Sequence, residues 1–191
     1  KMNTYRIIYF ILLAFSLSAC EVRMAPTEYW SKLFRTQTDS RYYQGKSEGL
    51  TNQIAKDIEE YEINRITIMD FVDEENRVSI LGEYLSSRVI EAFTGRSLFH
   101  DRTFRVTQKG EVNNILQELN LKHNYLYAKN ELKLLGKSLD SQAILTGRIT
   151  DLGTNIDMHL TLTDIVTGEV ISSATQNLTR TKFAVEMLRQ H

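Results

Sequence analysis

The chain is poor in the residues that cross-link, interrupt or strongly charge a protein. Its 191 residues include one cysteine and one proline, the formal net charge is −1, and the pI is about 6.5. A single cysteine forms no intramolecular disulfide, so an apolar core must hold the fold together. There is no basic run, and a nucleic-acid-binding domain is expected to be strongly basic. The composition therefore argues against nucleic acid as a partner.

The first twenty residues lack an apolar run long enough for a permanent membrane helix. The segment from Ile7 to Leu17 is almost wholly apolar, but it has roughly 11 residues against the ~20 that a bilayer requires. Lys1 and Arg6 precede it, and small residues follow it. A basic start, a short apolar segment and small residues before a cleavage point are typical of a secretory signal peptide. We predict one over residues 1–19.

The signal peptide leads directly into the only cysteine, in the order Leu17, Ser18, Ala19, Cys20. Small side chains let the backbone enter a protease cleft, and a sulfur nucleophile can accept a lipid. This tetrapeptide resembles the lipobox of bacterial lipoproteins. The resemblance implies cleavage before Cys20, a diacylglycerol on its sulfur and an N-acyl group, so that palmitate-type chains tie the protein to a membrane. The alternative is an idle thiol in an ordinary membrane anchor.

The mature protein would begin at Cys20 and face the periplasm or the cell exterior. Loss of Lys1 and Arg6 would leave it with a formal charge of −3. Three acyl chains hold a protein firmly, whereas one holds it only marginally. Glu21 follows the lipid site where an aspartate would favour retention in the inner membrane, so we expect the outer membrane.

Residues 20–46 show no clean hydrophobic period and contain Pro26, and we predict a short lipid-anchored tether there. The tether is unusually rich in aromatic and apolar residues, namely Tyr29, Trp30, Leu33, Phe34, Tyr42 and Tyr43. These either pack back on the domain or lie at the lipid interface, or they form a strip that docks a partner.

Regular patterns begin at Ser47, a candidate N-cap, and continue through a domain of residues 47–191. The predicted elements are a helix with Leu50, Ile54, Ile58 and Tyr61 on its apolar face, a strand over 64–72, a helix over 78–93, a strand over 102–106, a helix capped by Thr107, a helix over 128–139, strands over 142–150, 155–163 and 169–176, and a strand or helix from Thr181. This order predicts an α+β fold, with helices packed on a mixed sheet that ends in a three-stranded antiparallel meander.

Two strands carry the clearest orientation signal. In residues 155–163, apolar side chains alternate strictly with polar ones, so Ile156 to Leu162 should face inward at every second position. The predicted strand over 64–72 should be covered on both faces, with Ile68 pointing one way and Met69 and Phe71 the other.

Several of these segments resemble one group of bacterial lipoproteins. The segments from Ile66 to Asp73 and from Leu81 to Ser86, after the helix residues 50–55, resemble the opening of the FlgO-type flagellar outer-membrane lipoproteins. Residues 145–149 and 162–170 resemble the closing strands of that family. The same strand patterns occur in the curli-secretion lipoprotein CsgG and in the penicillin-binding-protein activator LpoB.

The resemblance implies a non-enzymatic structural or assembly component of an envelope machine, associated with the flagellum. Its partners would be envelope or flagellar proteins, with a homo-oligomer allowed. The alternatives are a periplasmic docking module that activates a cell-wall synthase, as LpoB-like proteins do, and a curli-type secretion component. A channel would need further amphipathic strands, and the sequence outside the core offers none.

Patterns for catalysis and cofactors are missing. Two Gly-Lys-Ser triplets begin at Gly45 and Gly136, but a phosphate-binding loop needs a further glycine where Ser40 and Glu131 stand, so no nucleotide is expected. The histidines show no metal-ligand spacing; they are His100, His123, His159 and His191. We therefore predict no enzyme activity, no metal and no cofactor.

Two polar groups remain, and each has a structural interpretation. His159 and Asp157 should form a pair on the sheet surface rather than a catalytic base. The acidic residues Asp70, Asp73, Glu74 and Glu75 lack the spacing of a calcium loop and are interpreted as a solvated turn.

Overall fold

The computed structural model describes residues 26–95 and 104–191, with side chains from Arg41 onward. The chain divides into two units, residues 1–38 and 39–191. In the first unit the described residues form the beginning of one helix, and the second unit is an α+β domain. Across the described ranges, no helix combines the length and apolarity needed to cross a membrane.

Helices alternate with strands before a closing run of three strands and a last helix. In chain order the described elements are α2 (Pro26–Glu60), β1 (Arg65–Ile68), α3 (Ile80–Thr94), β2 (Arg105–Val106), α4 (Lys109–Glu118), α5 (Lys129–Leu139), β3 (Ala143–Asp151), β4 (Asn155–Asp164), β5 (Val170–Thr179) and α6 (Lys182–Arg189). The predicted α+β class is confirmed, and the segment after Thr181 is a helix rather than a strand.

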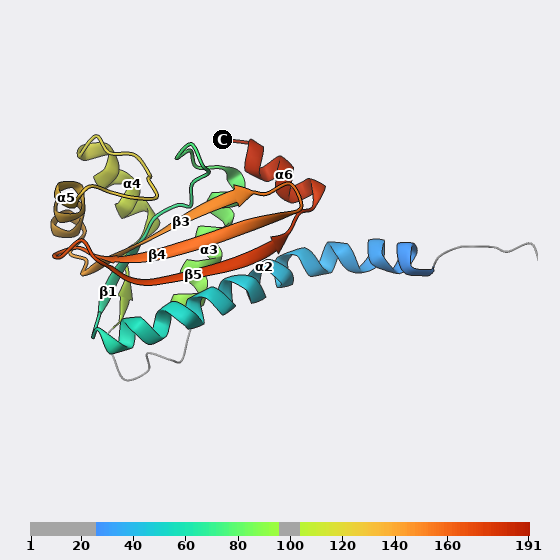
Figure 1. Cartoon of the computed structure of the whole chain (residues 1–191), viewed down its shortest axis with the longest axis horizontal. Coiled ribbons are helices and arrows are strands. Elements are labelled where there is room, and N and C mark those ends of the chain that lie inside the picture. Colours follow the sequence, from blue (N-terminus) through green and yellow to red (C-terminus); the bar gives the residue numbers. More distant parts are fainter. Residues whose placement is uncertain (1–25, 96–103) are drawn as a thin grey trace, which may run out of the picture. The chain divides into compact units, whose positions relative to one another are not determined.

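The five strands form one mixed sheet in the order β2-β1-β3-β4-β5. β1 runs parallel to both β2 and β3, whereas β3, β4 and β5 form the predicted antiparallel meander. Long strands thus fill one half of the sheet and short parallel strands the other (Figure 1).

Two apolar clusters lie on opposite faces of the sheet. The larger one joins α2, α3 and α6 to the sheet, with Ile54, Leu85 and Leu160 fully buried in it. The smaller one joins α4 and α5 to β1 and β3 around Met69 and Ile144. α4 and α5 lie over only one end of the sheet (Figure 1). The uncovered part of that face carries polar strand residues such as Asp157, His159 and Thr175.

The helix predicted from Ser47 in fact begins at Pro26, so Ser47 lies inside it and is no N-cap. The apolar stripe continues backward through Ser47 to Tyr43, and both residues are buried. A small serine at this position hides the period from the sequence. Tyr42 packs against the same cluster, so the docking of aromatic residues on the domain is confirmed for Tyr42 and Tyr43.

Three other local predictions are wrong. Tyr61 is 60% exposed because α2 ends at Glu60, before it. Phe71 packs in the same cluster as Ile68 rather than with Met69, because regular strand pairing ends at Ile68 and the change in backbone direction turns the next side chains over.

Thr107 does not cap α4, whose N-cap position is Gln108. The Thr107 hydroxyl instead lies 2.9 Å from that of Thr67 and 3.2 Å from that of Ser141, in a buried cluster of three hydroxyls.

Candidate functional site

The carboxyl end of β1 holds a buried carboxylate, Asp70, which is 7% exposed. Its Oδ1 accepts a hydrogen bond from Ser86 Oγ at 2.6 Å and lies 2.8 Å from Lys109 Nζ. Lys109 also pairs with Glu83 on the surface at 3.1 Å. A buried charge is tolerated when it is paired and hydrogen-bonded, and both conditions hold for Asp70.

His123 covers the other side of this carboxylate. Its Nδ1 accepts the backbone N–H of Asp70 at 3.3 Å, so Nε2 carries the proton of the neutral ring and faces Asn113 Oδ1 at 3.2 Å. Burial is the main cause that lowers the pKa of His123, and Lys109 lowers it further, while Asp70 and Glu83 act in the opposite direction.

The group contains a serine, a histidine and an aspartate, but they are not arranged as a catalytic triad. Ser86 Oγ donates to Asp70 and lies 2.9 Å from the carbonyl oxygen of Glu83. Both ring nitrogens of His123 are engaged elsewhere, so neither is placed to take the serine proton. These contacts therefore hold the loop after β1, the loop after α4 and the start of α4 together around the Asp70 carboxylate.

The loop after β1 is held by a second inward-facing carboxylate. Asp73 Oδ1 accepts the N–H groups of Glu75 and Arg77 at 2.8 and 2.9 Å, and its Oδ2 accepts two hydrogen bonds from the Arg77 guanidinium. Burial acts to raise the pKa of Asp73, but the hydrogen bonds from Arg77 and Glu75 outweigh it and keep the pKa below its usual value.

The interpretation of this acidic segment as a solvated turn was wrong for Asp70 and Asp73, which are 7% and 9% exposed, and holds for Glu74 and Glu75, which are exposed. The partners of Asp70, which are Ser86 and Lys109, lie outside the acidic segment and leave no sign in it. Asp73 is instead held within its own turn, by Glu75 and Arg77. Among the described residues, no three acidic, histidine or cysteine side chains are grouped to hold a metal ion.

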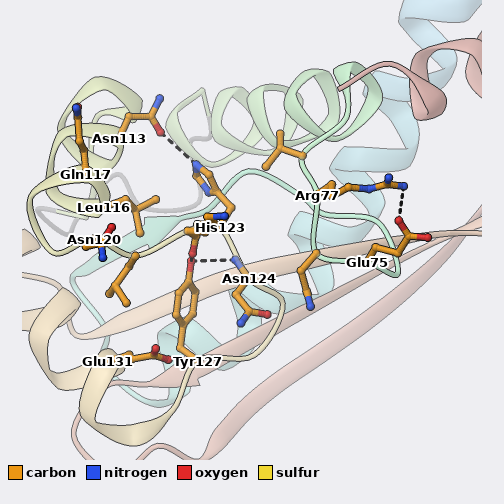
Figure 2. A pocket seen from close by; sticks show the side chains of 14 residues that line it. Glu75, Arg77, Asn113, Leu116, Gln117, Asn120, His123, Asn124, Tyr127 and Glu131 are labelled. Carbon is orange, nitrogen blue, oxygen red and sulfur yellow. Dashed lines mark hydrogen bonds and ion pairs between the residues drawn. The ribbon is translucent and has the colours of Figure 1, made fainter.

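A pocket of about 880 Å³ opens beside the residues around Asp70 and Asp73. It lies between the loop after β1, α4 and the loop that leads to α5 (Figure 2). Carboxamides dominate its polar lining, namely Asn76, Asn113, Gln117, Asn120 and Asn124. Leu116 and Leu121 add apolar surface, and the ion pair between Glu75 and Arg77, at 2.7 Å, stands at one side.

Tyr127 holds the wall of the pocket in place. Its hydroxyl donates to the carbonyl oxygen of Lys122 at 2.9 Å and accepts the N–H of Asn124 at 3.0 Å. Burial raises the pKa of Tyr127 well above its usual value, so the phenol remains a neutral donor. The pocket thus offers carboxamides together with charged side chains, among them Lys122 and Glu131, as hydrogen-bonding partners for a polar ligand.

A second polar surface lies on the sheet next to this loop. The Tyr125 hydroxyl lies on the sheet and is hydrogen-bonded to Thr161 Oγ1 at 2.8 Å. The Arg148 guanidinium carbon lies 4.2 Å from the Tyr125 ring centroid, and the His159 ring lies 5.9 Å from it. The predicted pair of His159 with Asp157 is not formed, because His159 Nδ1 instead lies 2.6 Å from Thr175 Oγ1.

The remaining sequence predictions fall into two groups. Both Gly-Lys-Ser triplets lie inside helices, α2 and α5, and neither forms a loop. The lipobox residues Leu17 to Cys20 and His100 lie outside the described residues. Lys109 pairs with Asp70 from the first turn of α4 and was not predicted as a site residue. A lysine at the start of a helix carries no sequence signal for a partner in a distant loop.

Comparisons with known proteins identify the fold. No family model and no curated protein matches the chain. Among solved structures, the C-terminal domain of LpoB from Salmonella enterica is 12% identical with a TM-score of 0.51, and the match covers 72% of this chain and 98% of that one. The corresponding Escherichia coli domain is also 12% identical with a TM-score of 0.52, covering 70% and 98%. The E. coli LpoB structure solved by NMR is 11% identical with a TM-score of 0.53, covering 71% and 68%.

At these identities the likeness shows the fold, and this chain has the fold of the LpoB C-terminal domain. The resemblance to this group of lipoproteins is thereby confirmed at the level of the fold. Membership of the FlgO family stays a prediction.

Proposed function

We propose that this chain is a lipid-anchored docking protein of the bacterial cell envelope, without enzymatic activity, and that it binds a cell-wall synthase. The observation that carries this proposal is that the fold of this chain matches 98% of each of two LpoB C-terminal domains. The lipobox at Leu17 to Cys20 supplies the anchor, and the docking role is the one that the resemblance to LpoB-like proteins implies.

The anchor can be tested directly because Cys20 is the only cysteine. Cells that express the full chain are fed an alkyne-tagged fatty acid, and the tagged protein is detected after membrane fractionation. The wild-type chain should carry the tag in the outer membrane, and Cys20→Ser should carry none. Glu21→Asp should move the tagged protein toward the inner membrane. A wild-type chain without the tag would refute the lipid anchor.

The arrangement around Asp70 supports a role in binding rather than catalysis. Ser86 donates to a carboxylate and His123 uses both ring nitrogens, which differs from the hydrogen-bonded pair that a nucleophile and its base form. The pocket beside them, in whose lining carboxamides are prominent, is the surface that we assign to the partner.

Docking at the pocket is tested with two variants on α4. Gln117→Trp would fill the pocket, and Asn114→Trp is the matched control because Asn114 is an exposed carboxamide residue on the same helix that does not line the pocket. Purified synthase is titrated onto the full-length protein in detergent, and affinity and glycan polymerisation are measured. We expect Gln117→Trp to abolish binding and Asn114→Trp to bind like the wild type. Equal binding by both variants, or no binding by the wild type, would contradict the proposal.

A flagellar machine is the second candidate, favoured by the segments that resemble FlgO-type lipoproteins. The most characteristic of them contains Ile66, Ile68 and Phe71, which are at most 2% exposed. These residues specify the core and leave the choice of partner to the surface. A deletion strain separates the two candidates: loss of motility with normal sensitivity to cell-wall inhibitors favours the flagellum, and the reverse favours the synthase.

A further inference from the structure

The two edges of the sheet differ greatly in length. β2, at one edge, has 2 residues, whereas β5, at the other, has 10. A long edge strand presents a row of unpaired backbone N–H and C=O groups that can pair with another strand. The edge at β5 is therefore the one at which this sheet can be extended.

The backbone groups of alternate residues in β5 point away from β4. The N–H of Thr179 shows this direction, because it donates to the Tyr42 hydroxyl at 2.7 Å instead of to β4. N–H and C=O groups of residues two apart point to the same side of a strand, so those of Ser173, Thr175 and Asn177 also face outward. All three residues are exposed, and Tyr42 occupies only the Thr179 end of the row.

The strand lacks two features that usually keep an edge from pairing, and its shift in register, between Val170 and Ser172, lies before the three outward residues. Its sequence, VISSATQNLT, contains no charged residue and no proline. Its outward side chains are already fixed on the polar face of the sheet: Thr175 lies 2.6 Å from His159, and Asn177 is hydrogen-bonded to Asn155. An ordered edge loses little further entropy when a second strand pairs with it.

We propose that β5 pairs with β5 of a second copy of this chain, antiparallel, about a two-fold axis at Thr175. Ser173 then lies opposite Asn177 of the partner subunit, and each such pair exchanges two backbone hydrogen bonds. A strand without charge can face itself without repulsion, and two opposed threonines form a favourable cross-strand pair. Pairing uses the long edge of each chain and, among the strands that the structure describes, leaves the short β2 edges free, so assembly stops at the dimer.

Cysteine scanning tests the register in the full-length protein in its own membrane. In the proposed pairing the two Thr175 Cα atoms lie ~5.5 Å apart, within the roughly 4.4–6.8 Å that a disulfide spans. Thr175→Cys should therefore form a covalent dimer under mild oxidation. Ser173→Cys is the matched control, because its own copy would lie about 13 Å away along the strand. The double variant Ser173→Cys with Asn177→Cys should cross-link again, and the wild type shows what Cys20 contributes.

The mass of the detergent-solubilised protein gives an independent readout. Sedimentation should give a dimer for the wild type, and Thr175→Lys should give a monomer with an unchanged far-UV circular dichroism spectrum, because two like charges would meet at the axis. A wild-type monomer throughout the micromolar range would overturn the proposal. So would a folded Thr175→Lys dimer, equal cross-linking of Thr175→Cys and Ser173→Cys, or cross-linking of Thr175→Cys to a different protein. If Thr175→Lys does not fold, the cysteine variants decide.

Discussion

We expect Gly82→Ala to destabilise the protein, although replacing a glycine inside a helix with alanine usually stabilises it. Gly82 lies in the first turn of α3, next to the N-cap Ser79, and packs on the loop that follows β1. A Cβ on Gly82 would overlap the carbonyl oxygen of Phe71 and lie 3.0 Å from its carbonyl carbon. That oxygen belongs to the backbone and cannot rotate away, so α3 or the loop would have to move.

The size of the effect follows from two opposing contributions. Alanine is favoured over glycine in a helix by about 0.8–1.0 kcal/mol, whereas overpacking a well-filled site costs about 1–3 kcal/mol. A backbone contact lies at the upper end of that range, so we expect Gly82→Ala to lower the free energy of unfolding by about 2 kcal/mol. For a domain of this size that corresponds to a fall in Tm of about 4–8 °C.

The matched control is Gly45→Ala in α2, where no atom lies within 4 Å of an added Cβ. Only the helix preference acts there, so the control should raise Tm by about 2–4 °C. Thermal unfolding of residues 39–191, followed by far-UV circular dichroism, measures both variants. A Gly82→Ala variant at least as stable as the wild type would refute the close packing of α3 on the β1 loop.

Three further predictions concern residues that line the pocket or hold the loops around it. His123 has a lowered pKa, so the unfolded chain binds more protons than the folded one below about pH 6.5. The free energy of unfolding, measured by urea titration, should therefore fall as the pH is lowered from about 7 to about 5. The His123→Gln variant should show a weaker dependence on pH. Tyr127→Phe removes a hydroxyl with two backbone partners and should cost about 1–2 kcal/mol in urea unfolding, with faster amide exchange at Asn124; unchanged exchange would count against its role. Asp73→Asn keeps the shape but loses the charge-assisted hydrogen bonds, and should cost about 1–3 kcal/mol at pH 7 in urea unfolding. Because the folded pKa of Asp73 lies below its usual value, this cost should be fully present above the ordinary carboxyl pKa and disappear only as the pH falls through the lowered pKa.

The sequence was most informative where local periods are strict. Alternation over residues 155–163 predicted β4, and its inward residues from Ile156 to Leu162 are all fully buried. The segment over 142–150 is apolar on both faces, and β3 is indeed paired on both sides and covered by both clusters. A strand between two layers leaves this signature because each face must be apolar wherever it is covered.

Predictions failed where one residue departs from its usual environment. Ser47 is fully buried inside α2, so a rule that places serine at helix starts put the start too late. Thr107 satisfies its hydroxyl in a tertiary cluster instead of capping α4. In both cases packing overrides a local preference that is worth only about 1 kcal/mol.

The candidate site could not have been assembled from local patterns. Asp70, Ser86, Lys109 and His123 come from four different segments, and their contacts depend on how β1, α3 and α4 pack. A sequence pattern reports neighbours along one element, whereas a buried carboxylate is satisfied by residues brought in from others. The acidic segment could therefore be found, but its inward orientation could not.

The pocket and the edge of β5 are compatible surfaces, because they belong to opposite halves of the sheet. The pocket is lined by the loop after β1 and by α4 with its following loop, whereas pairing at β5 occurs beyond β3 and β4. A dimer through β5 would leave one pocket free on each subunit. Two linked pockets bind a partner with two matching segments more tightly than either pocket alone, because the second contact forms at a high effective concentration. Loss of pairing should therefore weaken a bivalent partner without changing the affinity of a single pocket, whereas filling the pocket at Gln117 should abolish both.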